Sequence, residues 1–171
     1  GSHAQVVINE FMADNETGLL DEDGSFSDWI ELKNTSNTPV NLSGWYLTDK
    51  SNDLIKWEFP SVSIAANDYL VVFASSKNRS VAGSELHTNF GLSKNGEYLA
   101  LVQRDGTTVE DEYAPNYPEQ QADISYGIPL GGTTEVAIDE GAKHRPERIA
   151  CKAEKSGNGF KLSGKKDFVV Y

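Results

Sequence analysis

The side chains best suited to chemistry gather in an acidic, glycine-containing loop near the N-terminal end of the chain. Asp21, Asp23, Ser25 and Ser27 stand there at alternate positions, and Asp28 follows directly. Carboxylate and hydroxyl oxygens are the ligands that a hard cation such as Ca²⁺ prefers. The pattern therefore predicts a calcium site whose metal ligands include Asp21, Asp23 and Asp28.

This loop differs from the calcium-binding loop of an EF-hand in two ways. Gly24 occupies the fourth loop position instead of the sixth, and the twelfth position, which needs a bidentate glutamate, is Leu32. The alternative interpretation is a solvated acidic loop without a bound ion. No other cofactor is expected.

The residues available for acid–base or nucleophilic catalysis are few. Cys151 is the only cysteine, and His87 and His144 are the only histidines beyond the first four residues. The chain contains no phosphate-binding loop, GxSxG, HExxH or dinucleotide fingerprint. A nucleophile or general base also needs an orienting partner, which these isolated residues lack in sequence. We therefore expect a surface or hydrogen-bonded structural His87 and no enzymatic activity.

The elements that must position these residues are short strands. The stretch 28–47 has the pattern of a strand, a polar turn and a second strand. Ile30 and Leu32 share one face of the first strand, whereas Trp29 and Glu31 share the other. This alternation predicts a sheet with Ile30 and Leu32 in the core.

The other apolar runs are also short and rich in β-branched and aromatic residues. Because Tyr69–Ala74 is apolar on both faces, we expect a buried central strand there. Asp105-Gly106 predicts a two-residue hairpin turn, since Gly permits the positive φ of a type I′ turn. Further strands are expected at 5–11, 55–59, 97–104, 107–113 and 124–128.

No helical period of any length interrupts these runs, so the sequence predicts an all-β sandwich. The stretch 75–92 has no sustained period and is expected to be a long connection. Trp29, Trp45 and Trp57 are assigned to packing, with a stacking platform for sugars or bases as the alternative.

Charge is divided unevenly along the chain. Residues 1–142 carry seven Lys and Arg against 23 Asp and Glu, a balance of −16. Residues 143–171 carry eight Lys and Arg against three acids, a balance of +5. The acidic part would repel nucleic acid, which is therefore not an expected partner. The basic part could lie against the acidic part, belong to a following module, or be solvated without a partner.

The C-terminal forty residues differ in character from the rest. Residues 131–134 are expected to form a linker, and 149–154 and 160–163 flank a Ser-Gly-Asn-Gly turn, which suggests a β-hairpin. The apolar end at 168–171 is expected either to dock on the sandwich or to begin another module. No apolar run approaches the length of a membrane span.

Six segments in a fixed order resemble the lamin tail domain, most closely the bacterial version carried by secreted and surface proteins. The resemblance covers roughly Val6 to Pro129. The segments are VINEFMADN, DWIELKNTSNTPVNLSGWYLTD, KWEFP, YLVVFAS, LHTNFGLSKNGEYLALVQRDG and DISYGI. The resemblance implies an immunoglobulin-like β-sandwich and a non-catalytic accessory or interaction role.

We therefore expect residues 1–4 to be a tag remnant, residues 5–131 the sandwich, and residues 132–171 a basic extension or the start of a further module. The expected function is binding of a protein or cell-surface partner by a secreted or surface bacterial protein whose signal peptide has been removed. The alternatives are an accessory domain of a larger extracellular enzyme, such as a nuclease or phosphoesterase, and a calcium-stabilised adhesion module.

Overall fold

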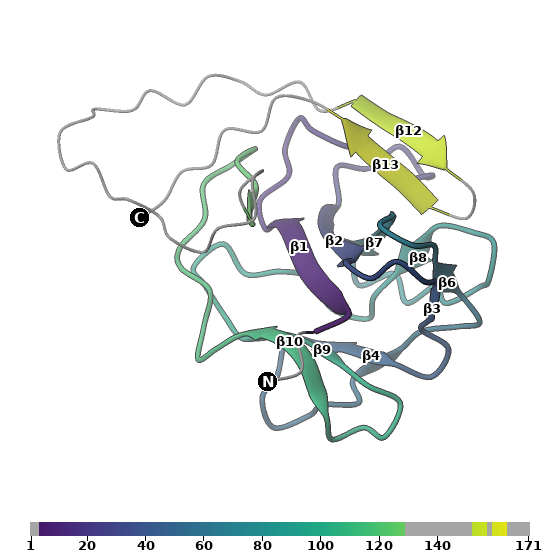
Figure 1. Ribbon diagram of the computed structural model, residues 1–171. Helices are drawn as coiled ribbons and strands as arrows, with labels where there is room; N and C mark the ends of the chain where they lie inside the picture. Colours follow the sequence, from purple (N-terminus) through teal and green to yellow (C-terminus); the bar gives the residue numbers. More distant parts are fainter. Residues whose placement is uncertain (1–3, 129–151, 157–158, 164–171) are drawn as a thin grey trace, which may run out of the picture.

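The computed structural model describes residues 4–128, together with the strands at 152–156 and 159–163. The described residues contain no helix, and two packed β-sheets account for the architecture (Figure 1). None of the described segments could therefore serve as a membrane-spanning helix. The predicted all-β, immunoglobulin-like sandwich is confirmed.

The first sheet has five strands in the order β11-β1-β2-β7-β8. Neighbours are antiparallel except β7 and β8, which are parallel, and β1 carries a bulge between Ile8 and Glu10. The strand bounds are β1 Val6–Met12, β2 Asp28–Asn34, β7 Tyr69–Ala74, β8 Leu86–His87 and β11 Tyr126–Gly127.

The second sheet has four strands in the order β10-β9-β4-β5, and two further strand pairs stand apart from both sheets. The four strands are β4 Tyr46–Thr48, β5 Trp57–Glu58, β9 Leu99–Val102 and β10 Val109–Tyr113. The separate pairs are β3 Val40–Asn41 with β6 Ser63–Ile64, and β12 Lys152–Ser156 with β13 Gly159–Ser163.

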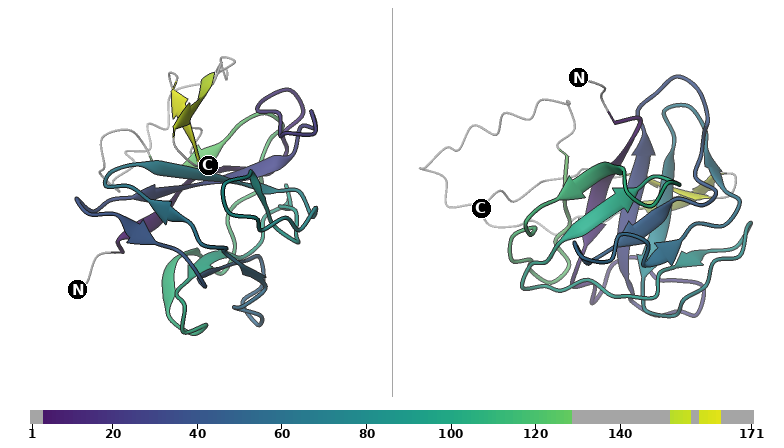
Figure 2. Two further views of the ribbon diagram at one scale, coloured as in Figure 1. Left: turned by 90° about the vertical axis from the view of Figure 1, so that its right-hand side faces the viewer. Right: turned by 90° about the horizontal axis from the view of Figure 1, so that it is seen from below.

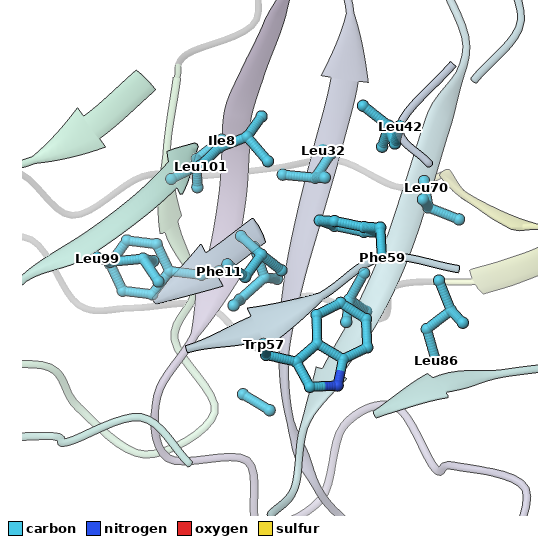
Figure 3. Packing of buried hydrophobic residues seen from close by; sticks show 14 of the residues in the cluster. Ile8, Phe11, Leu32, Leu42, Trp57, Phe59, Leu70, Leu86, Leu99 and Leu101 are labelled. Carbon is cyan, nitrogen blue, oxygen red and sulfur yellow. The ribbon is translucent and has the colours of Figure 1, made fainter. Parts of the chain in front are cut away.

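The core lies between the two sheets, as the alternation in β2 predicts. Ile30 and Leu32 project from β2 toward the second sheet and are fully buried, as are Leu99 and Leu101 on β9. Figure 3 shows the side chains that meet in this layer, with Trp57 at one end. Burying one aliphatic side chain of this size contributes about 1.5–3 kcal/mol, so this layer is the main source of stability.

Two expectations about connections were wrong. The stretch 75–92 contains β8, whose Leu86 and His87 pair with β7; two paired residues leave no periodic signal in a sequence. The hairpin at Asp105-Gly106 exists, but its connection spans 103–108. The Asp105 carboxylate accepts the backbone N–H groups of Thr107 and Thr108, which stabilises the longer turn.

The predicted C-terminal hairpin is confirmed as the pair β12–β13, in which Ser156 and Gly159 are partners next to the turn. Both views show it on the side of the first sheet that faces away from the second sheet (Figure 2). The expected linker at 131–134, His144, Cys151 and the apolar end at 168–171 lie outside the described residues. The predicted boundary at residue 131 therefore stays a prediction.

Candidate functional site

Two loops are joined by ion pairs at one end of the first sheet. The acidic loop after β1 supplies Asp21, Glu22 and Asp23, and the connection after β7 supplies Lys77 and Arg79. Lys77 Nζ lies 2.6 Å from Asp21 Oδ2 and 2.7 Å from Asp23 Oδ2. Arg79 lies 2.8 Å from both Glu22 Oε1 and Asp23 Oδ2. We call the two loops together the charged loop pair.

Asp21 organises the acidic half of this pair. Its carboxylate accepts the backbone N–H groups of Asp23 and Ser25, each at 3.0 Å, and the hydroxyl of Ser27 at 2.7 Å. Burial alone would raise the pKa of Asp21. The hydrogen bonds from Lys77, Ser27 and the two backbone groups outweigh this effect and lower its pKa to about 2. Asp21 is therefore a charged anchor for the turn at neutral pH.

The second layer of the pair is more exposed. Hydrogen bonds from Arg79 and then Lys77 lower the pKa of Asp23, and the hydrogen bonds of Arg79 to Asp23 and Glu22 raise the pKa of Arg79. Glu85 accepts the backbone N–H of Glu22 at 2.6 Å, and burial raises the pKa of Glu85. Four carboxylates therefore surround two cations, which leaves this end of the domain acidic.

His87, on β8, is a buried residue that packs beneath the charged loop pair, between the loops and the sheet. Its ring is fully buried, stacks on Phe73 with centroids 5.3 Å apart, and shares a hydrogen bond of 2.8 Å between Nδ1 and Ser75 Oγ. Burial lowers the pKa of His87, so the ring is neutral at pH 7. Of the two expectations for His87, the hydrogen-bonded structural role is confirmed, and a position on the surface is wrong.

Ser75, His87 and Glu22 lie in a row in space, like the serine, histidine and acid of a hydrolase triad. Their geometry, however, does not activate a nucleophile. Glu22 Oε1 lies 3.7 Å from His87 Nε2, which is too far for a hydrogen bond. The Ser75 hydroxyl already accepts the backbone N–H of Lys77. Because the His87 ring is also fully buried, a substrate cannot reach it. These three residues hold the connection after β7 in place and do not form a reaction centre.

Asp28 lies in a different environment from Asp21 and Asp23. It is the first residue of β2 and lies two positions before Ile30, so it is on the same, inward face of the strand. Its carboxylate accepts the backbone N–H of Asn15 at 3.1 Å. Burial raises the pKa of Asp28 to about 6, although hydrogen bonds from two backbone groups oppose the shift. The opposite shifts of Asp21 and Asp28 follow from this difference, since only Asp21 has a cation beside it.

The structure thus brings together two of the three predicted metal ligands. Asp21 and Asp23 share Lys77, whereas Asp28 faces the core. Nowhere in residues 4–128 do three His, Cys, Asp or Glu side chains gather in a way that could hold a metal ion. Calcium binding here stays a prediction, and the ion would have to displace the Lys77 ammonium group.

The charged loop pair also exposes apolar side chains. Leu20 and Phe26 are each 47% exposed on the acidic loop, and Val81 is 62% exposed on the facing connection. Ile55, at 59%, lies elsewhere, beside the turn at Gly106. Contiguous exposed apolar area is a mark of binding surfaces, and the two loops that carry these residues are held together by ion pairs. Sequence reasoning missed this surface because nothing in the chain indicates that the loops at 20–26 and 77–85 face each other.

A family model described as Lamin Tail Domain matches residues 1–115. The match extends from β1 to β10 and includes both loops of the charged loop pair, but ends before β11 and the C-terminal hairpin. A search among curated proteins returns no match.

Proposed function

The chain belongs to the lamin tail domain family of non-catalytic immunoglobulin-like domains, and from this premise we propose that it is an interaction module of a secreted or surface bacterial protein. Its partner in this proposal is a protein or a cell-surface component. Fold alone does not assign a binding site. The proposal therefore depends on the charged loop pair and its exposed apolar residues.

The observation that supports this site most strongly is the set of ion pairs that connects its two loops. Ion pairs from Lys77 and Arg79 connect the acidic loop to the facing connection, and Asp21 holds the turn from inside. Loops that are ordered before binding lose less conformational entropy when a partner docks. Phe26 and Val81 then provide apolar area, and aromatic anchors such as Phe26 carry much of the energy at protein interfaces.

Charge favours a partner that is basic or neutral at its contact surface. Four carboxylates and two cations meet at the charged loop pair, and residues 1–142 carry a balance of −16. Such a field repels nucleic acid and anionic polymers and accelerates association with a basic surface.

The alternative, an accessory domain of a larger extracellular enzyme such as a nuclease or phosphoesterase, would use the same surface. The two functions differ in what the native protein carries beside this domain. A catalytic domain in the same open reading frame would support the alternative.

Substitution of the exposed apolar residues tests the proposed surface. A Phe26→Ser/Val81→Ser double variant should bind isolated bacterial envelope at least about tenfold more weakly than the parent. Ile55→Ser is the matched control, because Ile55 is equally exposed but lies elsewhere. Equal binding by the parent and the double variant, or an equal loss in the control, would contradict the proposal.

A further inference from the structure

The outer face of the five-stranded sheet is buried, although the second sheet packs only on the inner face. Met12, Trp29, Val71 and Phe73 form an apolar cluster there, and Trp29 and Phe73 are each 1% exposed. Within the described residues, the only partly buried apolar side chain that packs against this cluster is Leu19, from the acidic loop. The outer face of a sheet in a two-layer sandwich normally faces water and carries polar side chains.

Two glutamates lie beside this apolar cluster on the same face. Glu10 on β1 and Glu31 on β2 are direct cross-strand partners, and they are 1% and 0% exposed. Asn9 Nδ2 donates to Glu31 Oε1 at 2.7 Å, and the Ser125 hydroxyl donates to Glu10 Oε1 at 2.5 Å. Like charges placed opposite each other are destabilising, and buried carboxylates need positive charge nearby. The outer face is therefore complementary to a segment that has both apolar and basic side chains.

The C-terminal hairpin is in place to provide that cover. It lies on the outer side of the sheet (Figure 2), and Cα atoms of β13 come within 8 Å of Cα atoms of β7. Its strands contain Lys152, Lys155 and Lys161 against a single acid, Glu154. The pairing register puts Lys152 and Lys161 on one face of the hairpin and Lys155 on the other, so each face carries positive charge. The whole segment 143–171 carries a balance of +5.

We propose that the outer face of the five-stranded sheet is a binding face for a basic β-hairpin, and that residues 152–163 of the same chain occupy it. The apolar cluster at Trp29 and Phe73 supplies the hydrophobic contact, and the glutamate pair selects a basic segment. The family match ends at residue 115, before this hairpin. The face is separate from the proposed partner surface at Phe26 and Val81, so the two can fail independently.

A nicking experiment on the full chain tests this inference. A protease site is inserted between Gly131 and Gly132, the protein is folded intact, and the chain is then cut. At low salt the fragment that contains the hairpin should remain bound to the sandwich in gel filtration. Release of that fragment from the parent at low salt would overturn the proposal.

Charge reversal identifies which residues hold the hairpin. Lys152→Glu/Lys155→Glu/Lys161→Glu reverses the hairpin's positive charge and should weaken rebinding of the cut fragment at least about tenfold, because attraction to Glu10 and Glu31 becomes repulsion. Lys50→Glu/Lys94→Glu is the matched control and should leave rebinding unchanged. Equal affinity in the triple variant and the parent would contradict recognition by charge.

A variant on the sheet side gives an independent readout. Val71→Glu adds a third carboxylate to the outer face and should also release the fragment. If this variant fails to fold, the triple lysine variant remains decisive, since it leaves every residue of the sandwich intact. A dimer of the uncut chain that exchanges hairpins between copies would refute occupation within one chain.

Discussion

The two sides of the five-stranded sheet are buried by different physical means. On the inner side, aliphatic residues such as Ile30 and Leu32 pack against the second sheet. On the outer side, apolar residues alternate with charged ones, and the row formed by Trp29 and Phe73 ends at His87 beneath the charged loop pair. The inner side should therefore set overall stability, whereas the outer side should respond to pH and salt.

Truncation of an inner residue should have the largest effect. Leu32→Ala removes a fully buried side chain between the sheets and should lower the free energy of unfolding by about 2–5 kcal/mol. The loss should be the same at low and high salt, because no charge is involved. Urea unfolding at two salt concentrations measures it, and a strongly salt-dependent loss would break the contrast between the two sides.

Removal of the anchor carboxylate Asp21 from the charged loop pair, at the end of the outer row, should cost less and depend on pH. Because the folded pKa of Asp21 is about 2 and its ordinary value is 3.8, Asp21 stabilises the fold above pH 3.8. This contribution is lost as the pH falls toward 2. Asp21→Asn should lower stability by about 1–2 kcal/mol at pH 7, after allowance for solvent screening, and by nearly nothing at pH 2. Thermal melts of parent and variant across this range measure the difference.

An inner-side carboxyl should show the opposite sign. The folded pKa of Asp28, about 6, lies above 3.8, so the parent loses stability as the pH rises from about 4 to 6. Asp28→Asn should abolish this loss. Between about pH 4 and 6, the free energy of unfolding of the variant should therefore rise by about 1 kcal/mol relative to that of the parent, after allowance for screening. Denaturation at pH 4 and pH 7 tests the sign, and parallel pH profiles for variant and parent would contradict it.

Calcium should produce the smallest effect. In the parent, Lys77 already neutralises Asp21 and Asp23, so millimolar Ca²⁺ should change the melting temperature little. A Lys77→Met variant frees both carboxylates and should be stabilised more by the ion, as mass action requires. If calcium instead stabilises the parent strongly and an Asp21→Asn/Asp23→Asn variant is unresponsive, the predicted calcium site is correct and Lys77 is displaced.

The sequence was informative wherever packing follows a simple period. Alternation at Ile30 and Leu32 predicted the inner face, and the two-sided apolar run Tyr69–Ala74 predicted a strand buried on both faces. That second signal already implied that something covers the outer side. The parallel pairing of Leu86 and His87 escaped because two residues carry no period.

The candidate site was less predictable than the fold. The acidic residues Asp21 and Asp23 are visible in the sequence, but their cations, Lys77 and Arg79, are more than fifty positions away. Only the tertiary fold brings them together. Asp28 adjoins the loop in sequence but follows the pleat of β2 into the core, so sequence proximity misplaced it.

The solvent exposure of Trp29 tests the contrast between the two sides most directly. Fluorotryptophan incorporated into the full chain gives separate ¹⁹F resonances for Trp29, Trp45 and Trp57, which Trp→Phe variants assign. The resonance of Trp29 should be as insensitive to exchange of H₂O for D₂O as that of core Trp57, whereas half-buried Trp45 should shift. A solvent shift at Trp29 larger than that at Trp45 would show an open outer face and contradict the account.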